Sequence, residues 1–330
     1  MRYTLILLIL LLGSQPSLAK WYKGNTHTHT NHSGDGDGSP GVVAKWYYDH
    51  GYDFVVLTDH NTRTSVRNIE IEGATRPFLV ISGEEITQWM DAGDRPNRRR
   101  VAVHVNGLWT QKTIEENSAL SVSGLIQKNV RSIQRQGGIS QLNHPNYRYS
   151  VSAQDLLFVR DLDLFELFNS SSETNNEGDT NHPSTEEIWD EVLSNGKMLY
   201  GVAGDDAHNF MNTVGNPDIV DYPGGGWIVV KADRLDGDEL YSNIKTGNFY
   251  ASNGVVLKEL KYNSLGIEIE IEPKRNVAYT VAFIGENGSV LKTVSGCHAS
   301  YVYSGKEKYV RARVSGSDGK KAWTQPQFLR

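Results

Sequence analysis

Short apolar segments that stop at histidine or aspartate recur along this chain, and they constrain its fold more than any other feature. One such segment ends in THTHT at residues 26–30, another in TDH at 58–60, and a late one in GDDAH at 204–208. Two histidines that are two residues apart point to the same face of a strand. Imidazole and carboxylate groups that converge on one side of a sheet form a ligand set for Zn, Fe or Mn. The pattern therefore predicts a polynuclear metal site.

The apolar segments alternate with helical segments in the first three quarters of the chain. This alternation favours parallel β/α units, and seven or eight such units favour an α/β barrel over an open sheet. Strands are predicted at 21–27, 54–58, 78–82, 101–105, 138–142, 162–168, 199–203 and 227–230. Amphipathic helices are predicted at 39–50, 123–136 and 184–195. Serine start signals and glycine stop signals mark the first and the third of them.

The pattern changes from about residue 255 onward. Isoleucine and glutamate alternate through 267–272, which is the period of a half-exposed strand. Asn287-Gly288 and Asp318-Gly319 are hairpin turn signals flanked by apolar alternation. These features predict a small antiparallel, β-sandwich-like domain at 255–330, after a barrel at 20–254, with no catalytic cluster of its own.

The first nineteen residues have the pattern of a signal peptide. Arg2 is followed by an apolar core at 5–12 and by the small-residue sequence Ser17-Leu18-Ala19. The apolar core is too short to span a bilayer, so no stable membrane anchor is expected. We therefore predict cleavage near Ala19 and a secreted or periplasmic protein. The lone Cys297 excludes an intrachain disulfide, so stability comes from a conventional core.

The net charge of −6 gives no reason to expect a nucleic-acid duplex as a partner, because the basic triplet at 98–100 stands alone.

In a β/α barrel the carboxyl ends of the strands all face one mouth, where active sites lie. Carboxylates are needed there to bridge closely spaced dications, and a water between two metals loses its proton near neutral pH to become a nucleophile. No Gly-x-Ser-x-Gly elbow, His-Glu-x-x-His motif or zinc-finger spacing offers a competing site. The residues at or near strand ends are His27, His29, Asp59, His60, Glu84, Glu85, His104, His144, Glu166, Asp206 and His208.

Five ordered motifs carry a resemblance to a known family. They are THTH at 26–29 with Ser33 and Asp35-Gly36, LTDHN at 57–61, GEEI at 83–86, NHP at 143–145 and GDDAH at 204–208. Together they resemble the PHP (polymerase and histidinol phosphatase) family, and more narrowly its exported carbaryl-hydrolase-like branch. The resemblance also covers residues 227–254 and a trailing β domain. It implies a distorted (β/α)7 PHP-type barrel that holds two to three divalent metals (Zn, Mn or Fe).

The same resemblance implies three ligand sets. The first metal would be held by His27, His29, Glu85 and Asp206, the second by the bridging Glu85 with His104 and His144, and the third by Asp35, His60 and His208. Six of these ligands are also the candidate catalytic residues, because the metals that they hold activate the nucleophile: His27, His29, His60, Glu85, Asp206 and His208.

Three assignments within these sets depend on the family pattern. The pattern Gly-any-Glu favours Glu85 over Glu84, whereas strand alternation alone does not choose between them. Asp59 is expected to orient a ligand. The family usually has Ser-Asp-Gly, but here Ser-Gly-Asp-Gly at 33–36 carries an extra glycine. The third site is therefore completed by Asp35 through a longer turn, or by Asp37 or His32 in its place.

The activity implied by the resemblance is phosphoester hydrolysis, on a small-molecule or a saccharide or nucleotide phosphoester. Hydrolysis of a carboxyl ester, amide or carbamate on the same metals is the alternative, and a non-catalytic binding module is the third hypothesis. A phosphate substrate calls for arginines near the metals, and a carbonyl substrate for an apolar wall. The candidate substrate contacts are Arg63, Arg67, Arg95, Arg98, Arg148, Tyr147, Tyr149 and His182.

Overall fold

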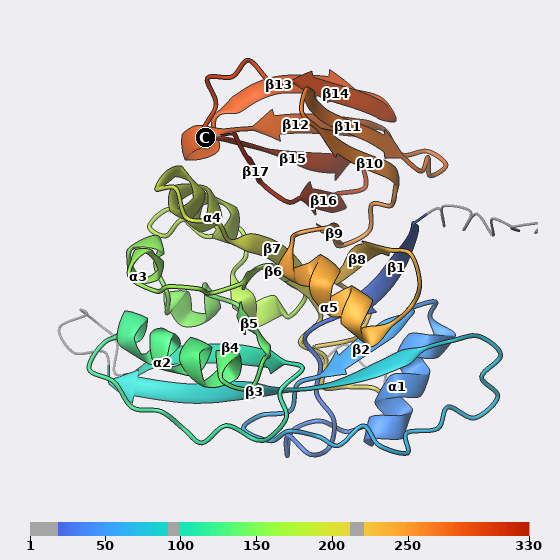
Figure 1. Cartoon of the computed structure of the whole chain (residues 1–330), viewed down its shortest axis with the longest axis vertical. Helices are drawn as coiled ribbons and strands as arrows, with labels where there is room; N and C mark the ends of the chain where they lie inside the picture. Colours follow the sequence, from blue (N-terminus) through green and yellow to red (C-terminus); the bar gives the residue numbers. More distant parts are fainter. Residues whose placement is uncertain (1–18, 92–99, 212–220, 330) are drawn as a thin grey trace, which may run out of the picture.

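The chain is a mixed α/β protein with one large sheet and few helices. The computed structural model describes residues 19–91, 100–211 and 221–329 (Figure 1). Residues 1–18 of the predicted signal peptide at 1–19 therefore lie outside the described residues. Within the described part of the chain, no helix combines the length and the apolar character that a membrane span requires.

The first part of the chain supplies the strands that position the polar clusters. They are β1 (Lys20–Asn25), β2 (Phe54–Leu57), β3 (Leu79–Asp91), β4 (Arg100–Leu108), β5 (Ile139–Leu142), β6 (Leu164–Asn169), β7 (Tyr200–Gly204), β8 (Trp227–Ala232) and β9 (Phe249–Ser252). The strand order of this part is β9-β8-β1-β2-β3-β4-β5-β6-β7. Each of the eight predicted strands is present, although β3 continues nine residues beyond the predicted end at residue 82.

The prediction of uniformly parallel β/α units is wrong for two strands. The pairs β1–β2, β2–β3, β5–β6 and β6–β7 are parallel. In contrast, β4 is antiparallel to both β3 and β5, and β8 is antiparallel to β1 and β9. For β4 the reason is that β3 runs on to Asp91 and β4 begins at Arg100, so the connection is shorter than the dozen or more residues that a parallel crossover needs.

The sheet is curved but not closed. Among residues 19–91, 100–211 and 221–329, no ladder of hydrogen bonds joins β7 to β8 or to β1. A closed (β/α)7 barrel is therefore not confirmed. The polar segments beyond β1 and β7 still meet, because an isolated parallel bridge pairs Thr28 with Ala207.

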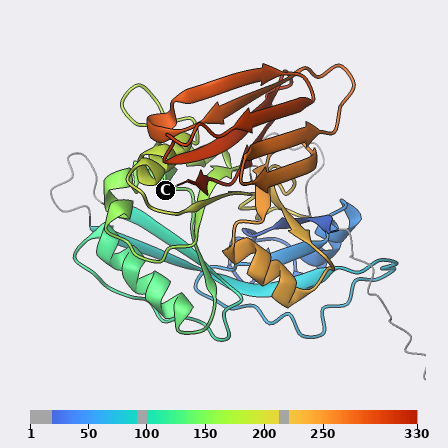
Figure 2. The ribbon, with the colours of Figure 1, turned by 45° about the horizontal axis from the view of Figure 1, so that its top comes forward.

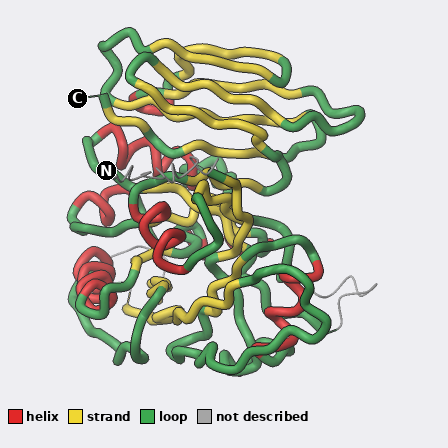
Figure 3. Tube along the Cα trace, turned by 45° about the vertical axis from the view of Figure 1, so that its right-hand side comes forward, coloured by secondary structure: helices red, strands yellow, loops and turns green. Residues whose placement is uncertain are grey.

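The helices lie outside the sheet and begin at serine or aspartate caps. They are α1 (Pro40–Asp49), α2 (Val122–Gln134), α3 (Ala153–Leu157), α4 (Thr185–Ser194) and α5 (Gly237–Lys245). The three predicted helices are confirmed as α1, α2 and α4. At α4 a capping box forms: the amide of Glu187 donates to the Ser184 hydroxyl, and the Ser184 amide donates to the Glu187 carboxylate. Figure 3 shows these helices around the strands of the first part of the chain, and the sequence of elements places all five before β10.

The C-terminal strands form two stacked layers (Figure 2). Ile267, Ile269 and Ile271 point into the layer between them and are buried, as the alternation predicts. The large sheet also crosses the predicted boundary at residue 254, because β9 pairs with a C-terminal strand, β16 (Lys321–Thr324). These strands are β10 (Leu257–Asn263), β11 (Gly266–Ile271), β12 (Tyr279–Ile284), β13 (Val290–Ser295), β14 (His298–Val302), β15 (Tyr309–Gly316), β16 (Lys321–Thr324) and β17 (Gln327–Phe328).

A buried ionic cluster joins these strands to α4. Arg311 of β15 is fully buried, and its guanidinium donates to both carboxylate oxygens of Asp190, at 2.7 and 2.5 Å, and to Glu186 at 2.9 Å. Its charge also lies over the ring of Trp189, 4.9 Å from the ring centre. Burying an arginine is costly unless its charge is compensated, so the partners on α4 hold the strands and the helix together.

We predict that Asp190→Ala lowers the free energy of unfolding by about 3–5 kcal/mol, because it leaves the Arg311 charge buried with one carboxylate fewer. Urea unfolding followed by tryptophan fluorescence measures this change. The matched control is Asp49→Ala, which breaks an exposed pair with Lys45 and is expected to change stability by less than about 1 kcal/mol. Equal effects of the two variants would contradict the importance of the buried cluster.

Candidate metal centre

Three segments that leave the ends of strands run side by side at one edge of the sheet. The amide of Thr58 donates to the carbonyl of Thr28 at 2.9 Å, and the amide of Asp206 donates to the carbonyl of His27 at 2.9 Å. His27 and His29 are both fully buried. The structure thus brings together the histidine clusters that are distant in the sequence, because backbone hydrogen bonds join the segments that follow β1, β2 and β7.

Glu85 lies at the centre of the cluster and is fully buried. Each of its two carboxylate oxygens faces a different set of imidazole nitrogens. Oε1 lies 3.2 Å from His104 Nδ1, 3.4 Å from His144 Nε2 and 3.5 Å from His27 Nε2. Oε2 lies 2.6 Å from His60 Nδ1 and 3.8 Å from His29 Nε2. One carboxylate that serves two sets of ligands in this way has the geometry of a bridge between two cations.

Asp206 is a second carboxylate with a divided environment. Its Oδ1 lies 3.1 Å from Nε2 of both His27 and His29, and its Oδ2 lies 3.8 Å from His144 Nε2. Its backbone is in the left-handed region, with φ of 53°, which non-glycine residues adopt at a cost. The surrounding contacts therefore hold the side chain of Asp206 in the centre of the cluster.

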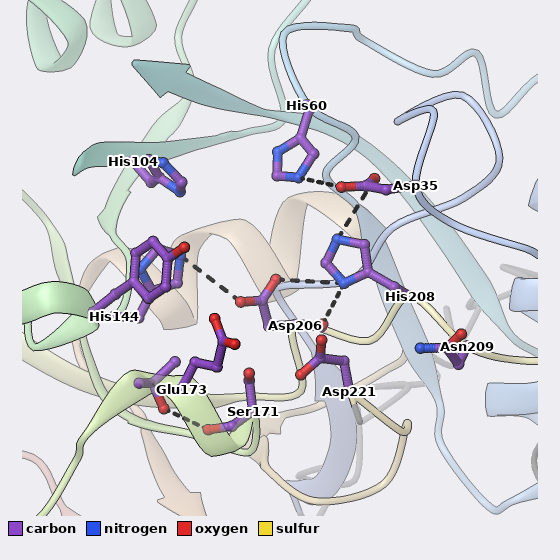
Figure 4. Close-up of a pocket in the computed structure, with 12 residues that line it drawn as sticks. Asp35, His60, His104, His144, Ser171, Glu173, Asp206, His208, Asn209 and Asp221 are labelled. Carbon is purple, nitrogen blue, oxygen red and sulfur yellow. Dashed lines mark hydrogen bonds and ion pairs between the residues drawn. The ribbon is translucent and has the colours of Figure 1, made fainter. Parts of the chain in front are cut away.

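A third set lies nearer the solvent, where Asp35 faces two histidines (Figure 4). Asp35 Oδ2 lies 3.4 Å from His60 Nε2, and Asp35 Oδ1 lies 3.7 Å from His208 Nε2. The two other residues considered for this place point elsewhere. The carboxylate of Asp37 accepts the amides of Phe210 and Met211, and His32 Nδ1 lies 3.0 Å from the hydroxyl of Thr64.

The neighbouring Glu84 faces away from the cluster. Its carboxylate accepts the amide of Ile114 at 3.0 Å, and burial raises its pKa to about 7. Successive residues of a strand point to opposite faces, so only one of the two glutamates can join the cluster. The structure places Glu85 there.

The donor set fits divalent cations. Four groups of three residues each offer ligand atoms that lie within 4.8 Å of one another: His27, His29 and Glu85; Glu85, His104 and His144; His27, His144 and Asp206; and His29, His60 and His208. Both ring nitrogens of His104 are buried without a hydrogen-bond partner among the described residues. A buried polar group left unpaired is destabilising, and a cation beside His104 would relieve that cost.

Hydrogen bonds outside the cluster orient the imidazoles. A carboxylate only accepts, so His27 Nδ1 donates to Glu166 Oε1 at 2.8 Å, and His27 Nε2 faces the centre. The other oxygen of Glu166 accepts the amide of His144 at 2.8 Å and the side-chain amide of Asn169 at 2.9 Å. The sequence predicts Glu166 on a strand, and no motif in the sequence points to its contact with His27. This carboxylate–histidine pair is typical of the residues that support metal ligands.

Asp59 orients His29 through Ser33, as expected of a residue that supports a ligand. The Ser33 hydroxyl donates its one proton to Asp59 at 2.8 Å, and it accepts the amide of His60 at 3.1 Å. His29 Nδ1, 2.9 Å from the same hydroxyl, must therefore be the donor of that hydrogen bond. The lone pair of His29 Nε2 is consequently directed at Glu85 and Asp206.

The cluster contains ionised carboxylates, an uncharged histidine, and histidines whose pKa the neighbouring carboxylates raise against the effect of burial, among them His27 and, to about 10, His60. Burial raises the pKa of Glu85, but the neighbouring His104 and His60 lower it well below the ordinary value. Burial also raises the pKa of Asp206, and His27 lowers it well below the ordinary value. Burial and the nearby histidines lower the pKa of His29 to about 3. Anionic carboxylates and a neutral imidazole are the protonation states in which these groups bind metals.

The cluster opens into a cavity of about 290 Å³. No arginine or lysine is among the described residues that line it, which are Asp35, His60, His104, His144, Tyr147, Ser171, Glu173, Thr174, Asp206, His208, Asn209 and Asp221.

Of the side chains predicted to contact substrate, some lie at the cavity and others are engaged elsewhere. Arg63 Nε donates to the carbonyl of Thr110 at 2.6 Å, and Arg67 is exposed. The guanidinium of Arg148 lies over the rings of Trp89 and Tyr147, at 5.0 and 5.4 Å. Tyr147 lines the cavity, whereas Tyr149 stacks on His182, with 3.8 Å between the ring centres. Arg95 and Arg98 lie outside the described residues.

Comparison with known proteins gives distant structural similarities. No protein-family model and no curated protein matches the chain. A two-domain protein of Bacteroides vulgatus that contains a predicted PHP-like metal-dependent phosphoesterase is 16% identical, with a TM-score of 0.47 and 92% of each chain covered. A candidate metal-dependent phosphoesterase of Bifidobacterium adolescentis is 14% identical, with a TM-score of 0.41, 61% of this chain and 92% of that chain covered. Neither similarity is close enough to establish an activity.

We predict that Asp35→Ala lowers the metal content by about one equivalent and leaves the deeper ions bound, because only the outer set contains this carboxylate. Inductively coupled plasma mass spectrometry after dialysis against Mn²⁺ or Zn²⁺ measures the change. Asp37→Ala is the matched control and is expected to leave the metal content unchanged. A loss in the Asp37 variant alone would exclude Asp35 from the third set.

We predict that Glu166→Gln weakens metal binding about tenfold, because the amide that replaces the carboxylate makes His27 a poorer ligand. Competition with a coloured chelator gives the dissociation constants. Glu187→Gln, which alters only the cap of α4, serves as a control for a general loss of structure. Unchanged affinity in the Glu166 variant would show that its bond to His27 does not support the metal centre.

Proposed function

We propose that this chain is a metal-dependent hydrolase of the PHP type that cleaves phosphoesters at a di- or trinuclear centre. One observation carries the proposal: the two oxygens of Glu85 and the two oxygens of Asp206 face different sets of ligands, at the distances given above. Two bridging carboxylates are what closely spaced cations require, since a histidine nitrogen serves only one metal.

The residues that would hold the cations are those of the three sets. When bound, divalent cations supply Lewis acidity, lower the pKa of a water molecule and offset negative charge that develops in the transition state. His27 and His29 are fully buried, so the deep sets exclude bulk water from one side of the reacting group. The side chains of His60 and Asp35 are 23% and 57% exposed, so the outer set is the one that substrate reaches first.

A phosphoester is favoured because a phosphoryl group offers several oxygens to neighbouring cations at once. A carboxyl ester, amide or carbamate is the second candidate. It is favoured by the absence of arginine and lysine from the described lining, since a phosphate is commonly gripped by such residues. Secretion or a periplasmic location, after cleavage near Ala19, is part of the proposal and is based on the pattern of residues 1–19 alone.

We predict that metal-reconstituted protein releases p-nitrophenol from a phosphate monoester or diester, and that His60→Ala lowers kcat/KM about a hundredfold. The assay compares p-nitrophenyl phosphate, bis-p-nitrophenyl phosphate and p-nitrophenyl acetate. His50→Ala is the matched control, because His50 stacks on Trp46 away from the cluster.

The outcomes separate the candidates. Phosphate-ester cleavage that depends on His60 supports the phosphoesterase and ranks monoester against diester. Cleavage of the acetate alone, with the same dependence, replaces it with the acyl hydrolase. Full metal loading without cleavage of any of the three compounds would contradict both activities and favour a binding module.

A further inference from the structure

The cavity beside the metal centre has a polar wall formed by residues far apart in the sequence. Ser171 and Glu173 come from the segment between β6 and α4, and Asn209 and Asp221 come from the segment after β7. Figure 4 shows the side chains of Ser171 and Glu173 pointing into the cavity toward Asp206. The described wall therefore offers hydroxyl, amide and carboxylate groups but no cationic side chain.

Asp221 supplies an unused hydrogen-bond acceptor on this wall. Its Oδ1 is buried and has no hydrogen-bond partner among the described residues. The segment that follows is held by the buried Asp205, whose carboxylate accepts the amides of Gly224, Gly225 and Gly226 at 2.7–2.9 Å. The position of Asp221 is also fixed directly, since its carbonyl accepts the amides of His208 and Asn209 at 3.1 and 3.4 Å. A ligand hydroxyl that reached its unpaired carboxylate oxygen would relieve the cost of burying that acceptor.

Tyr147 forms an aromatic surface at the same cavity, next to the metal ligands. Its ring centre lies 5.4 Å from that of His144. The backbone around it is held in a costly conformation, since Arg148 and Tyr149 have positive φ values of 54° and 50°. The buried side chain of Asn146 fixes this segment by donating to carbonyls of the 170–184 segment, including that of Pro183 at 2.8 Å. The aromatic and polar surfaces are therefore tied to each other.

We propose that this cavity selects a phosphoester whose leaving group is an uncharged polyol, such as a sugar. The carbon face of the polyol packs against Tyr147, and its hydroxyls donate to Glu173 and Asp221. A second anionic group on the substrate is rejected, because it would face two carboxylates with no described cation between them. The same carboxylates attract an ammonium group, but an ammonium group only donates hydrogen bonds. Hydroxyls donate to the carboxylates and also accept from the Ser171 hydroxyl, so a polyol matches the mixed wall.

This inference rests on the proposed phosphoester hydrolysis. In that reaction the oxygen of water forms a new bond to phosphorus while the bond from phosphorus to the leaving oxygen breaks. The leaving oxygen takes up a proton, and the products are inorganic phosphate and the free polyol. The residues of the polar wall contact the leaving group and not the phosphorus.

Three monoesters of similar size test the selectivity: glycerol 3-phosphate, phosphoethanolamine and 3-phosphoglycerate. With Mn²⁺-loaded protein we expect kcat/KM for glycerol 3-phosphate to exceed that for 3-phosphoglycerate about a hundredfold, with phosphoethanolamine between them. Glu173→Gln is expected to raise the ratio of 3-phosphoglycerate to glycerol 3-phosphate turnover about tenfold, because it removes one repelling charge. A substitution that only disturbed the fold would lower the turnover of both esters together and leave their ratio unchanged.

Glu177→Gln is the matched control from the same segment. The carboxylate of Glu177 is 79% exposed and pairs with Lys321 at 2.8 Å instead of lining the cavity. This variant should leave the ratio unchanged. Equal use of glycerol 3-phosphate and 3-phosphoglycerate, a preference for phosphoethanolamine, or no change of ratio in the Glu173 variant would each overturn the proposed selectivity.

Calorimetric binding of the same three esters in the presence of Ca²⁺ separates this inference from the proposed function. If none of the esters is hydrolysed but binding follows the expected order, the hydrolysis of these esters is wrong and the selectivity of the cavity stands. If they are hydrolysed but bind and react without the expected order, the function stands and the selectivity is wrong. Absence of both hydrolysis and binding overturns both.

Discussion

The fully buried carboxylate of Glu85 is the group on which the rest of the site depends. An ionised carboxylate away from water is strongly destabilising unless compensating groups surround it. Here five imidazoles lie within 3.8 Å of its oxygens, and the side-chain amide of Asn143 donates to Oε1 at 2.8 Å. Most of those imidazoles are themselves buried, so they need the carboxylate in turn. Divalent cations held by the three sets would complete this balance of charge. The mutual compensation explains why so many polar side chains can be buried at this edge of the sheet.

The cluster also depends on supports that carry no ligand atom. Glu166 holds His27 by Nδ1 and the backbone of His144 by its other oxygen, so one carboxylate positions two strand ends. Asp59 acts through Ser33 on His29. In both cases the support fixes which ring nitrogen faces the centre. Such preorganisation matters because a ligand that must reorient before binding loses affinity.

The C-terminal strands reach the site indirectly, through α4. The segment at 170–184 lines the cavity with Ser171 and Glu173 and then continues into α4, whose Asp190 and Glu186 bind the buried Arg311 of β15. The last strands of the chain therefore brace one wall of a cavity built by the first strands. The pairing of β9 with β16 makes that brace continuous with the sheet that carries the histidines.

Sequence alone was enough to locate the strands, the three longer helices and the convergence of the histidine clusters, because period and capping are local and strand ends share an edge. It did not determine that β4 and β8 run antiparallel or that the sheet stays open, since strand direction depends on connections and partners distant in the chain. It could not choose between Asp35, Asp37 and His32 either. The path of the loop separates the three side chains. The carboxylate of Asp37 accepts backbone amides of residues 210 and 211, and His32 contacts the hydroxyl of Thr64. Only Asp35 faces His60 and His208. Residue type and spacing thus determined which chemistry is present, and only tertiary packing decided which atoms meet.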